Sequence, residues 1–312
     1  MNKETQLGYC CINLSLKPKN ISVNHTCRKK TFLDNGLPYV STLAIKNITS
    51  LIEIIKWNIH NNIKVYRMSS DMFPWMSEYE IKDLPDFNEL SNLLSIVGKL
   101  AIDNNIRLSF HPGPFNVLGS PNLINVTKTT KELNQHAEIM DLMGLPQTRE
   151  YPINIHWNGT YGDKDATLKR WSDNFLKLSK SAQSHLVVEN DDKGSMYSVF
   201  DLYHGIFKRV GVSITFDYHH HRFNTSDLSE MEAFMLAYST WDVKPLFHYS
   251  SCRKTHEDPT CKAQAHADYI YEKINDYGMA VDIDVEAKAK DIAILKYREH
   301  HQLLLDNYIP MV

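Results

Sequence analysis

The chain has 312 residues, of which 43% are hydrophobic and 23% are charged, and its formal net charge is −3 at pH 7. This composition is ordinary for a globular protein and excludes one whose whole surface attracts polyanions. No stretch reaches the roughly 20 apolar residues that a membrane helix needs. We therefore expect a soluble protein that forms a single domain over residues 1–312.

Eight short runs rich in β-branched and apolar residues predict eight strands. They cover residues 7–14, 63–70, 106–112, 152–157, 185–191, 212–218, 245–251 and 280–288. Helix-like segments follow them, for example residues 90–105, 126–144 and 196–211. Eight repeats of strand then helix predict a (β/α)₈ TIM barrel of the α/β class. An open, doubly wound sheet is the alternative, but no strand leads into the Gly-rich phosphate loops of that fold.

The start of the chain and its cysteines indicate where the protein works. The first residues pass quickly into an apolar run and lack the pattern of a signal peptide. Five cysteines are odd in number and form no C-x-x-C pair, so they predict neither a disulfide framework nor a thiolate zinc site. We expect a reducing, intracellular compartment.

Histidines and acids stand where the predicted strands end, and a barrel brings all these ends to one face. Packed acids without a lysine among them repel each other unless a cation compensates them. Imidazole and carboxylate ligands without thiolate suit Zn²⁺, Mn²⁺ or Fe²⁺. A polynuclear metal site for phosphodiester hydrolysis is therefore predicted, and metal-dependent sugar isomerisation is the alternative. The strand-end residues are His111, His156, Glu189, Asp217, His220, His248 and Glu286.

Several longer motifs make the chain similar to a known family. They are LGYCCINL, YRMSSDMFPW, SFHPG, SPN, IHWNGTYGDK, VVEND, DYHHHRFN, FHYSS, AQAHADYI and DVEAKAKD. In this order and spacing they resemble the UV damage endonucleases, barrel enzymes related to apurinic nucleases of the endonuclease IV type. The resemblance implies metal-dependent incision of double-stranded DNA immediately 5′ to a UV photoproduct, which leaves a 3′-hydroxyl and a 5′-phosphate.

The resemblance also implies a ligand set for up to three ions per chain. Mn²⁺ is the metal expected, and Zn²⁺ or Mg²⁺ are the alternatives. His111, His156 and Glu189 would hold one ion. Glu189 would bridge it to a second ion on Asp217, His248 and Glu286, and His220 and His266 would hold a third. The catalytic residues implied are Glu189, Asp217, His220 and Glu286.

DNA contacts are expected around this metal site. The resemblance places Tyr9 and Asn13 near the damaged nucleotides, and Arg67 is a candidate for a phosphate contact. Further candidates for DNA contacts are Pro114, Phe115 and Lys244. The loop after the first predicted strand contains no acid between Glu4 and Asp34. Its basic residues are predicted to bind the DNA backbone; they are Lys17, Lys19, Arg28, Lys29 and Lys30.

The sequence departs from the family pattern at two positions. Pro114 and Phe115 stand where the family usually carries Gln followed by an aromatic residue. Phe115 keeps an aromatic ring that can insert between base pairs as a wedge, but Pro114 lacks the amide hydrogen-bond donor of Gln. Leu246 stands where some members carry a carboxylated lysine. Either Lys244 replaces that lysine from a shifted position, or the third ion is held more weakly.

Three other functions compete with a UV photoproduct endonuclease that acts as a monomer. An apurinic-site endonuclease would use the same metal framework. A sugar isomerase would turn over aldoses and would not bind DNA. A damage-binding protein without activity is the least consistent with metal ligands at so many strand ends.

Overall fold

The computed structural model describes residues 4–157 and 159–306, with the backbone alone for residues 301–306. Eight parallel strands form one sheet in the order β6-β5-β4-β3-β2-β1-β8-β7, which confirms the predicted barrel. The predicted domain, residues 1–312, also contains residues outside this description. The strands are β1 (Leu7–Cys10), β2 (Val65–Met68), β3 (Arg107–Phe110), β4 (Ile153–His156), β5 (Leu186–Glu189), β6 (Ile214–Thr215), β7 (Leu246–Tyr249) and β8 (Asp282–Val285).

The barrel closes between β6 and β7 through a narrow contact. An isolated parallel bridge joins Asp217 to His248, and the His248 N–H donates to the Phe216 carbonyl at 3.0 Å. Asp217 follows β6 and His248 lies within β7. Two of the predicted ligands therefore lie on the seam that closes the ring.

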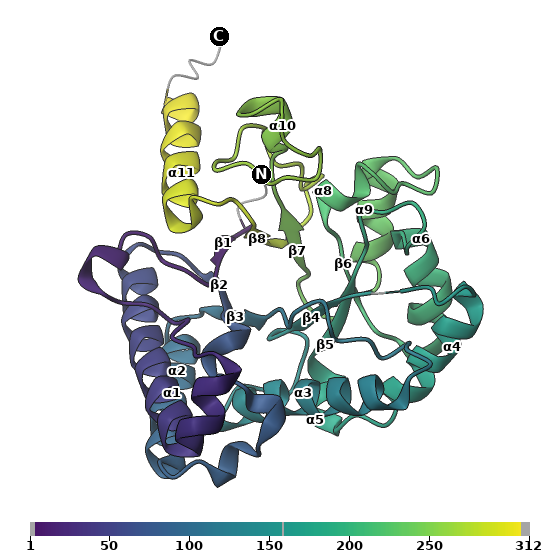
Figure 1. The fold of residues 1–312 in the computed structure, drawn as a ribbon. Coiled ribbons are helices and arrows are strands. Elements are labelled where there is room, and N and C mark those ends of the chain that lie inside the picture. Colours follow the sequence, from purple (N-terminus) through teal and green to yellow (C-terminus); the bar gives the residue numbers. More distant parts are fainter. Residues whose placement is uncertain (1–3, 158, 307–312) are drawn as a thin grey trace.

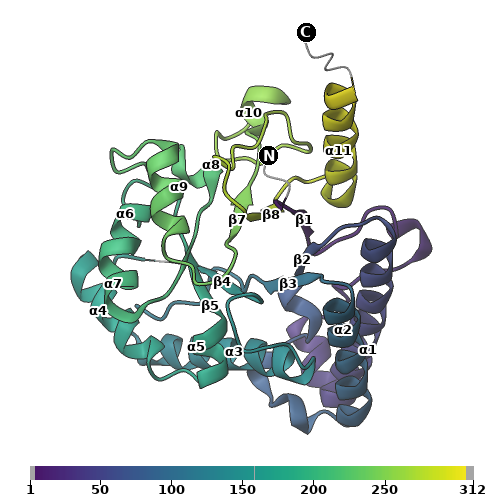
Figure 2. The same cartoon turned by 180° about the vertical axis from the view of Figure 1, so that it is seen from behind.

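Helices surround the sheet, and α1 and α2 lie side by side in both views (Figures 1 and 2). The predicted segments 90–105, 126–144 and 196–211 correspond to α2, α3 and a continuous run of α6, the π-helical turn η5 and α7. The helices are α1 (Lys29–His60), α2 (Phe87–Asp103), α3 (Leu123–Leu142), α4 (Lys164–Phe175), α5 (Lys180–His185), α6 (Val199–Leu202), η5 (Tyr203–Phe207), α7 (Lys208–Val210), α8 (Tyr218–His221), α9 (Glu230–Tyr238), α10 (Arg253–His256) and α11 (Lys290–Asp306). Short 3₁₀ turns are η1 (Lys17–Lys19), η2 (Ser70–Met72), η3 (Met76–Glu78) and η4 (Ile81–Asp83).

The segment between β7 and β8 differs from the predicted alternation. It contains only the four-residue helix α10, and residues 257–281 are irregular. Ile274 is buried there, and Tyr269 and Tyr277 pack against the core, so irregular chain covers the barrel where a helix was expected. Within residues 4–157 and 159–306, no helix is both long and apolar enough to cross a membrane.

Arg107 closes the amino-terminal end of the barrel. Its side chain is buried and donates to the carbonyls of Glu150 at 2.7 Å and Lys244 at 2.7 Å, and to the Asp282 carboxylate at 3.2 Å. The Lys244 ammonium lies 2.7 Å from the same carboxylate. Because Lys244 precedes β7, it lies at the end of the barrel opposite the carboxyl ends of the strands. This position disfavours both the predicted DNA contact of Lys244 and the alternative in which Lys244 supports the third ion.

Removal of the Arg107 side chain should destabilise the whole fold. Arg107→Met leaves several buried carbonyls without their donor and weakens the compensation of Asp282, which keeps only Lys244. We expect a loss of about 3–5 kcal/mol in the free energy of unfolding, measured by urea denaturation. Lys169→Met, which breaks an exposed pair with Asp173 on α4, should cost less than about 1 kcal/mol. Equal losses would contradict the assigned role of Arg107.

Candidate metal centre

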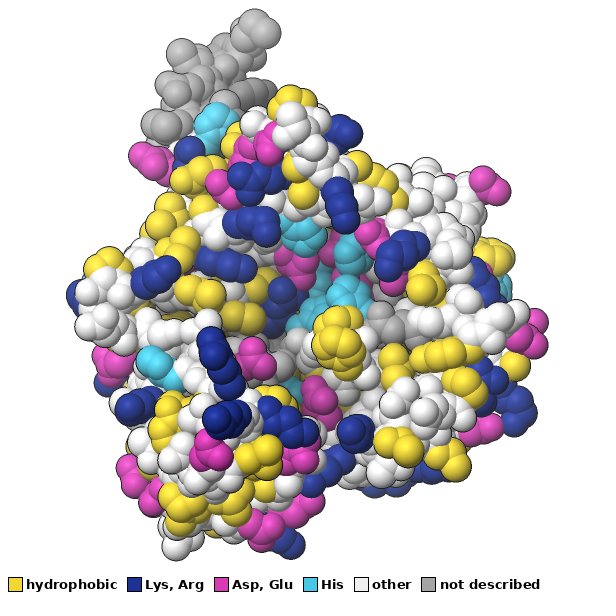
Figure 3. Space-filling model, viewed as in Figure 1, with side chains coloured by type: hydrophobic (Ala, Val, Ile, Leu, Met, Phe, Trp, Pro, Cys, Tyr) yellow, Lys and Arg dark blue, Asp and Glu magenta, His cyan; other side chains and the backbone are white. Residues whose placement is uncertain are grey.

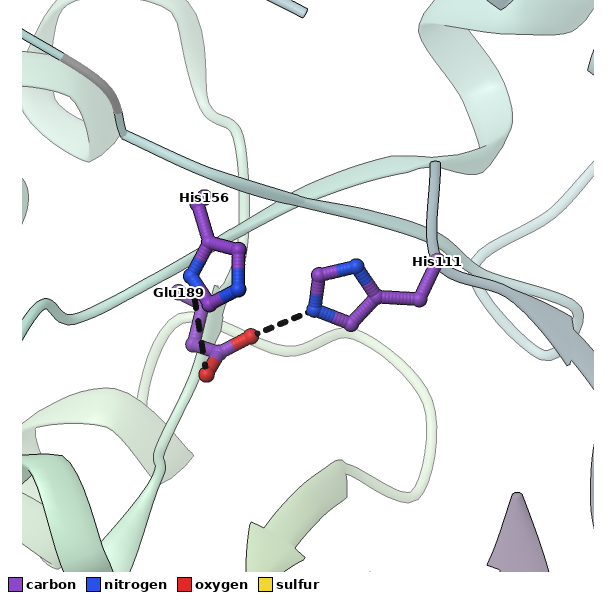
Figure 4. A group of neighbouring side chains, drawn as sticks. All are labelled: His111, His156 and Glu189. Atoms are coloured by element: carbon purple, nitrogen blue, oxygen red, sulfur yellow. Dashed lines mark hydrogen bonds and ion pairs between the residues drawn. The ribbon is translucent and has the colours of Figure 1, made fainter. Parts of the chain in front are cut away.

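Glu189, the last residue of β5, lies at the centre of the carboxyl-terminal face. Its carboxylate is completely buried, and four imidazoles surround it. The ring nitrogens lie 3.0 Å away for His111, 3.0 Å for His220, 3.2 Å for His248 and 3.9 Å for His156. Figure 4 shows how His111 and His156 point toward the two oxygens of Glu189. Side chains from four other βα units thus converge on one carboxylate.

The remaining predicted ligands complete a continuous cluster. Glu286 Oε1 lies 3.6 Å from His248 Nδ1, and Glu286 Oε2 lies 3.4 Å from His266 Nδ1. Three groups have ligand atoms within 4.8 Å of one another and could each hold an ion: His111, His156 and Glu189; His111, His248 and Glu286; Glu189, Asp217 and His220. In Figure 3, histidines gather near the centre of this face, with lysines and arginines around them.

The turn after β6 decides which histidine of the DYHHH run faces the cluster. Asp217 caps α8, because its Oδ1 accepts the His220 backbone N–H at 2.7 Å. The Asn190 side chain exchanges two hydrogen bonds with the Asp217 backbone, at 2.8 and 3.0 Å, and so ties the ends of β5 and β6 together. His220 Nδ1 consequently lies 3.9 Å from Asp217 Oδ2 and faces Glu189.

His219 and His221 point elsewhere. His219 is completely buried and packs edge-on against His266, with ring centroids 5.3 Å apart. Burial and the neighbouring His266 lower the pKa of His219 to about 4. The His221 ring lies 5.4 Å from Phe216 in the core. The three consecutive histidines therefore occupy three different environments.

His266 reaches the cluster from the irregular segment between β7 and β8. Backbone hydrogen bonds from Ala267 to Ser251 and from Arg253 to Ala265 form a short antiparallel return over the end of β7. His266 and His220 also line one pocket of about 240 Å³, together with His156 and Pro114. The structure thus brings His266 to the same site as the other candidate ligands.

The charges of the buried carboxylates and imidazoles in this cluster favour bound cations. Burial acts to raise the pKa of the Glu189 carboxyl, but the surrounding histidines outweigh it and hold this pKa well below its usual value. Burial opposes a charge on His220, yet the Asp217 and Glu189 carboxylates raise its pKa to about 11. Glu189 Oε1, Asp217 Oδ2 and His248 Nδ1 are buried and, within the described part of the chain, make no hydrogen bond of good geometry. Buried oxygen and nitrogen atoms without hydrogen-bond partners are suitable ligands for divalent metal ions.

Arg67 is a cation within the site rather than a free phosphate contact. Its NH1 lies 2.6 Å from Glu286 Oε1, and its side chain is only 12% exposed. Burial acts against its charge, but the nearby thiols and acids keep the pKa of Arg67 well above its usual value. The guanidinium compensates a candidate ligand, so the structure favours this role of Arg67 over the predicted phosphate contact.

Tyr9 and Asn13 lie inside the protein. The Tyr9 hydroxyl donates to Asn58 Oδ1 at 2.8 Å and accepts from Asn13 Nδ2 at 2.8 Å, and both predicted residues are fully buried. Burial raises the pKa of the Tyr9 phenol well above its usual value. A direct contact with DNA would require both side chains to leave this network, so the structure favours core packing for them.

The rim residues have the exposure that a DNA contact needs. Phe115, in the loop between β3 and α3, is 88% exposed, and Pro114 beside it lines the pocket near His220. The basic loop after β1 runs through η1 to the start of α1, where Lys29 lies 3.9 Å from Glu78 and over the ring of Trp75. These residues stay candidates for DNA binding.

Two asparagines were missed by the sequence reasoning. Asn154 Nδ2 donates to Glu189 Oε2 at 2.5 Å from one layer deeper in the barrel. It stands two residues before His156 in β4, and the alternation of strand residues could have placed it on the inner face. Asn190, the residue after Glu189, gave no local signal, because its partner Asp217 follows the next strand of the barrel.

Comparison with known proteins identifies the family. The family model of UV-endonuclease UvdE matches residues 5–307. The chain belongs to the UvdE family. It is 31% identical to the UV-damage endonuclease of Schizosaccharomyces pombe, with 96% of this chain and 51% of that protein covered. It is 28% identical to the UV DNA damage endonuclease of Clostridium perfringens, with 93% of this chain and 69% of that protein covered.

Solved structures agree with this membership in the UvdE family. The crystal structure of SacUVDE matches with a TM-score of 0.82 and 30% identity, over 96% of this chain and 99% of that one. A D-psicose 3-epimerase from Clostridium cellulolyticum matches with a TM-score of 0.52 and 12% identity, over 76% of this chain and 78% of that one. The second likeness shows a shared barrel fold alone.

Replacement of Glu189 should remove the centre of the ligand cluster. Glu189→Gln keeps the shape of the side chain but cannot bridge two ions. Since loss of a residue that merely supports a ligand costs 10–100-fold, we expect metal affinity and DNA incision to fall by at least about 100-fold. Metal analysis of the purified protein and a nicking assay would measure both. Glu53→Gln on the outer helix α1 is the matched control, and full activity of Glu189→Gln would refute the ligand arrangement.

The two neighbouring histidines of the DYHHH run should respond differently to alanine. His220→Ala removes a ring that faces Glu189, so Mn²⁺ binding and activity should fall by about 100-fold. His221→Ala should lower thermal stability while Mn²⁺ affinity is retained, because His221 packs on Phe216. Titration with Mn²⁺ and thermal melts of both variants would show the difference. Equal losses of affinity would mean that His220 is not the ligand of this pair.

Proposed function

We propose that this UvdE-family chain is a metal-dependent endonuclease that nicks double-stranded DNA immediately 5′ to UV photoproducts. The observation that carries the proposal is the buried Glu189 carboxylate within 3.9 Å of four imidazoles. The family membership and the names of the relatives supply the substrate.

The ligand groups support a centre of two or three ions. His111, His156 and Glu189 would hold one ion. Two further groups of close ligand atoms would hold the others: His111 with His248 and Glu286, and Glu189 with Asp217 and His220. His220 lies closer to Glu189 and Asp217 than the sequence implied, and it faces the pocket that His266 also lines. Bound Mn²⁺ or a similar divalent ion would activate water and stabilise the charge that develops on the phosphate.

The protein's own residues would orient the substrate and keep the site in place. Asn190 and Asp217 fix the turn that presents His220, and Arg67 holds Glu286. Phe115 would insert at the damaged step, where the duplex is easiest to open, and the basic loop after β1 would hold the backbone. We further propose that damaged DNA is bound by a monomer inside the cell.

Two labelled duplexes would test the substrate. The purified protein would be incubated with Mn²⁺ and a duplex that carries a thymine dimer or an abasic analogue. Incision immediately 5′ to the dimer, abolished by a chelator, is expected. Cleavage of the abasic duplex alone would replace the proposal with an apurinic-site endonuclease. Turnover of an aldose without DNA cleavage would instead support a sugar-converting enzyme.

The exposed ring of Phe115 allows a test of how damaged DNA is bound. Phe115→Ala should weaken binding to the dimer-containing duplex by about 10–100-fold, because stacking of a base on an aromatic ring contributes roughly 1–3 kcal/mol. Binding would be measured by fluorescence anisotropy with Ca²⁺ in place of Mn²⁺. Leu176→Ala, an equally apolar exposed residue that follows α4, is the control and should bind as the wild type does. Unchanged binding by Phe115→Ala would exclude the wedge.

A further inference from the structure

Asp291, in the first turn of α11, is an acid without exposed surface. Acidic side chains are almost never fully buried unless other groups compensate them. No ion pair of Asp291 within 4.0 Å exists among the described residues. α11 follows β8, the strand that pairs with β1, and its first turns lie beside β1 in both views (Figures 1 and 2). The compensation of Asp291 comes from the chain that follows β1.

The Asp291 carboxylate accepts three hydrogen bonds from this chain. Oδ1 accepts from the Leu14 N–H at 2.6 Å. Oδ2 accepts from the Ser15 N–H at 3.1 Å and from Ser15 Oγ at 2.6 Å. Asn13 adds a fourth bond nearby, because its Oδ1 accepts from the Leu16 N–H at 2.8 Å. These bonds fix the four residues that lead into η1.

The exposed part of the same loop is a short basic turn. η1 consists of Lys17, Pro18 and Lys19, and all three residues are exposed. Leu16 before the turn and Val23 after it are buried in the core. Within the described part of the chain, neither lysine has a carboxylate within 4.0 Å. Both ammonium groups can therefore bind phosphates without first breaking an ion pair.

The backbone at this junction is held in an unfavourable conformation. Cys11, which follows β1, has a φ of 63°, and Lys290, which precedes Asp291, has a φ of 52°. Side chains other than glycine rarely adopt this left-handed region, and they stay in it only where the surrounding contacts fix them. The hydrogen bonds of Asp291 are contacts of this kind, because they join the segment after Cys11 to the residue after Lys290.

We propose that Asp291 is a positioning residue for DNA binding, which holds the turn Lys17–Lys19 ready to contact the phosphate backbone. This inference rests on the proposed function and names the group that orders the basic loop. Asp291 itself cannot touch DNA, because it has no exposed surface. A loop that is ordered before binding loses less conformational entropy when it binds, so its affinity is higher.

Asp291→Asn tests this role at almost constant side-chain size. An amide has only one acceptor oxygen, so the N–H of Leu14 or of Ser15 would face an NH₂ group. Binding of a duplex that carries a thymine dimer, measured by fluorescence anisotropy with Ca²⁺, should weaken by about 5–10-fold. The rate of incision at saturating DNA should stay within about twofold, because no candidate metal ligand is changed.

Removal of the two lysines separates positioning from a general loss of structure. Lys17→Ala combined with Lys19→Ala should weaken binding by about 10–30-fold and reduce the slope of log affinity against log salt by about 2. Asp291→Asn added to these two changes should weaken binding by less than about twofold more, because the contacts that it positions are already gone. A purely structural loss would lower affinity by the same factor in both backgrounds.

Asp282→Asn is the matched control, since it changes a buried acid at the amino end of the barrel. It should lower the melting temperature, because Arg107 and Lys244 lose a charged partner, and leave DNA affinity within about twofold. If Asp291→Asn does not fold, Ser15→Ala takes its place. It removes one of the three hydrogen bonds and should weaken DNA binding by about two- to fivefold, again only while both lysines are present.

The outcomes distinguish the inference from the proposed function. A wild-type chain that neither binds nor nicks the damaged duplex would overturn the proposed function and this inference with it. Wild-type binding that is unchanged in Asp291→Asn, or that falls equally with and without the two lysines, would overturn the inference and leave the proposed function intact. The same criteria apply to Ser15→Ala where that variant replaces it.

Discussion

The burial of the Glu189 carboxylate is the constraint on which the rest of the site depends. The carboxylate has no exposed surface, and imidazoles from four other βα units lie 3.0–3.9 Å from it. A carboxylate in such a place is stable only when positive charge reaches it, either from protons on the histidines or from metal ions. A protonated imidazole cannot bind a metal, so the two forms of compensation exclude each other and ions must displace protons. This shared need for positive charge, more than any single ligand, makes the carboxyl end of the barrel a candidate cation site.

The buried carboxylates at the two ends of the barrel are compensated in different ways. At the amino end, Arg107 satisfies the Asp282 carboxylate and several backbone carbonyls, so this end is closed by permanent charges. At the carboxyl end, buried oxygen and nitrogen atoms keep ligand capacity that the described residues do not use. In barrels of this kind the first end serves stability and the second serves chemistry. The narrow Asp217–His248 bridge adds a further link, because closure of the ring itself brings two ligands together.

The sequence predicted the strands and the candidate ligands well, because both depend on local patterns. Runs of β-branched residues mark each strand, and a polar residue at the end of a strand must lie on the carboxyl face. The differences between expectation and structure concern contacts between distant residues. Arg67 pairs with Glu286, 219 positions away, and no local pattern indicates this. Lys244 was placed at the site although residues before a strand lie at the opposite end, and the hydrogen-bonded core around Tyr9 depends on Asn58 from α1. The irregular chain between β7 and β8 was missed because buried tyrosines and isoleucines can pack on a barrel without a helical period.

The shared barrel does not choose between sugar and DNA chemistry, so the choice must come from the rim. A small sugar is best held when the site encloses it and hydrogen bonds surround its hydroxyls. Here the pocket next to His156 and His220 is lined by Pro114, and Phe115 beside it projects into solvent with 88% of its surface exposed. An exposed aromatic ring at the edge of the pocket can stack on the face of a nucleobase. A polymer that enters from the side, with its phosphate directed at the ligand cluster, satisfies both the exposed ring and the buried charge, whereas a free sugar would satisfy only the second.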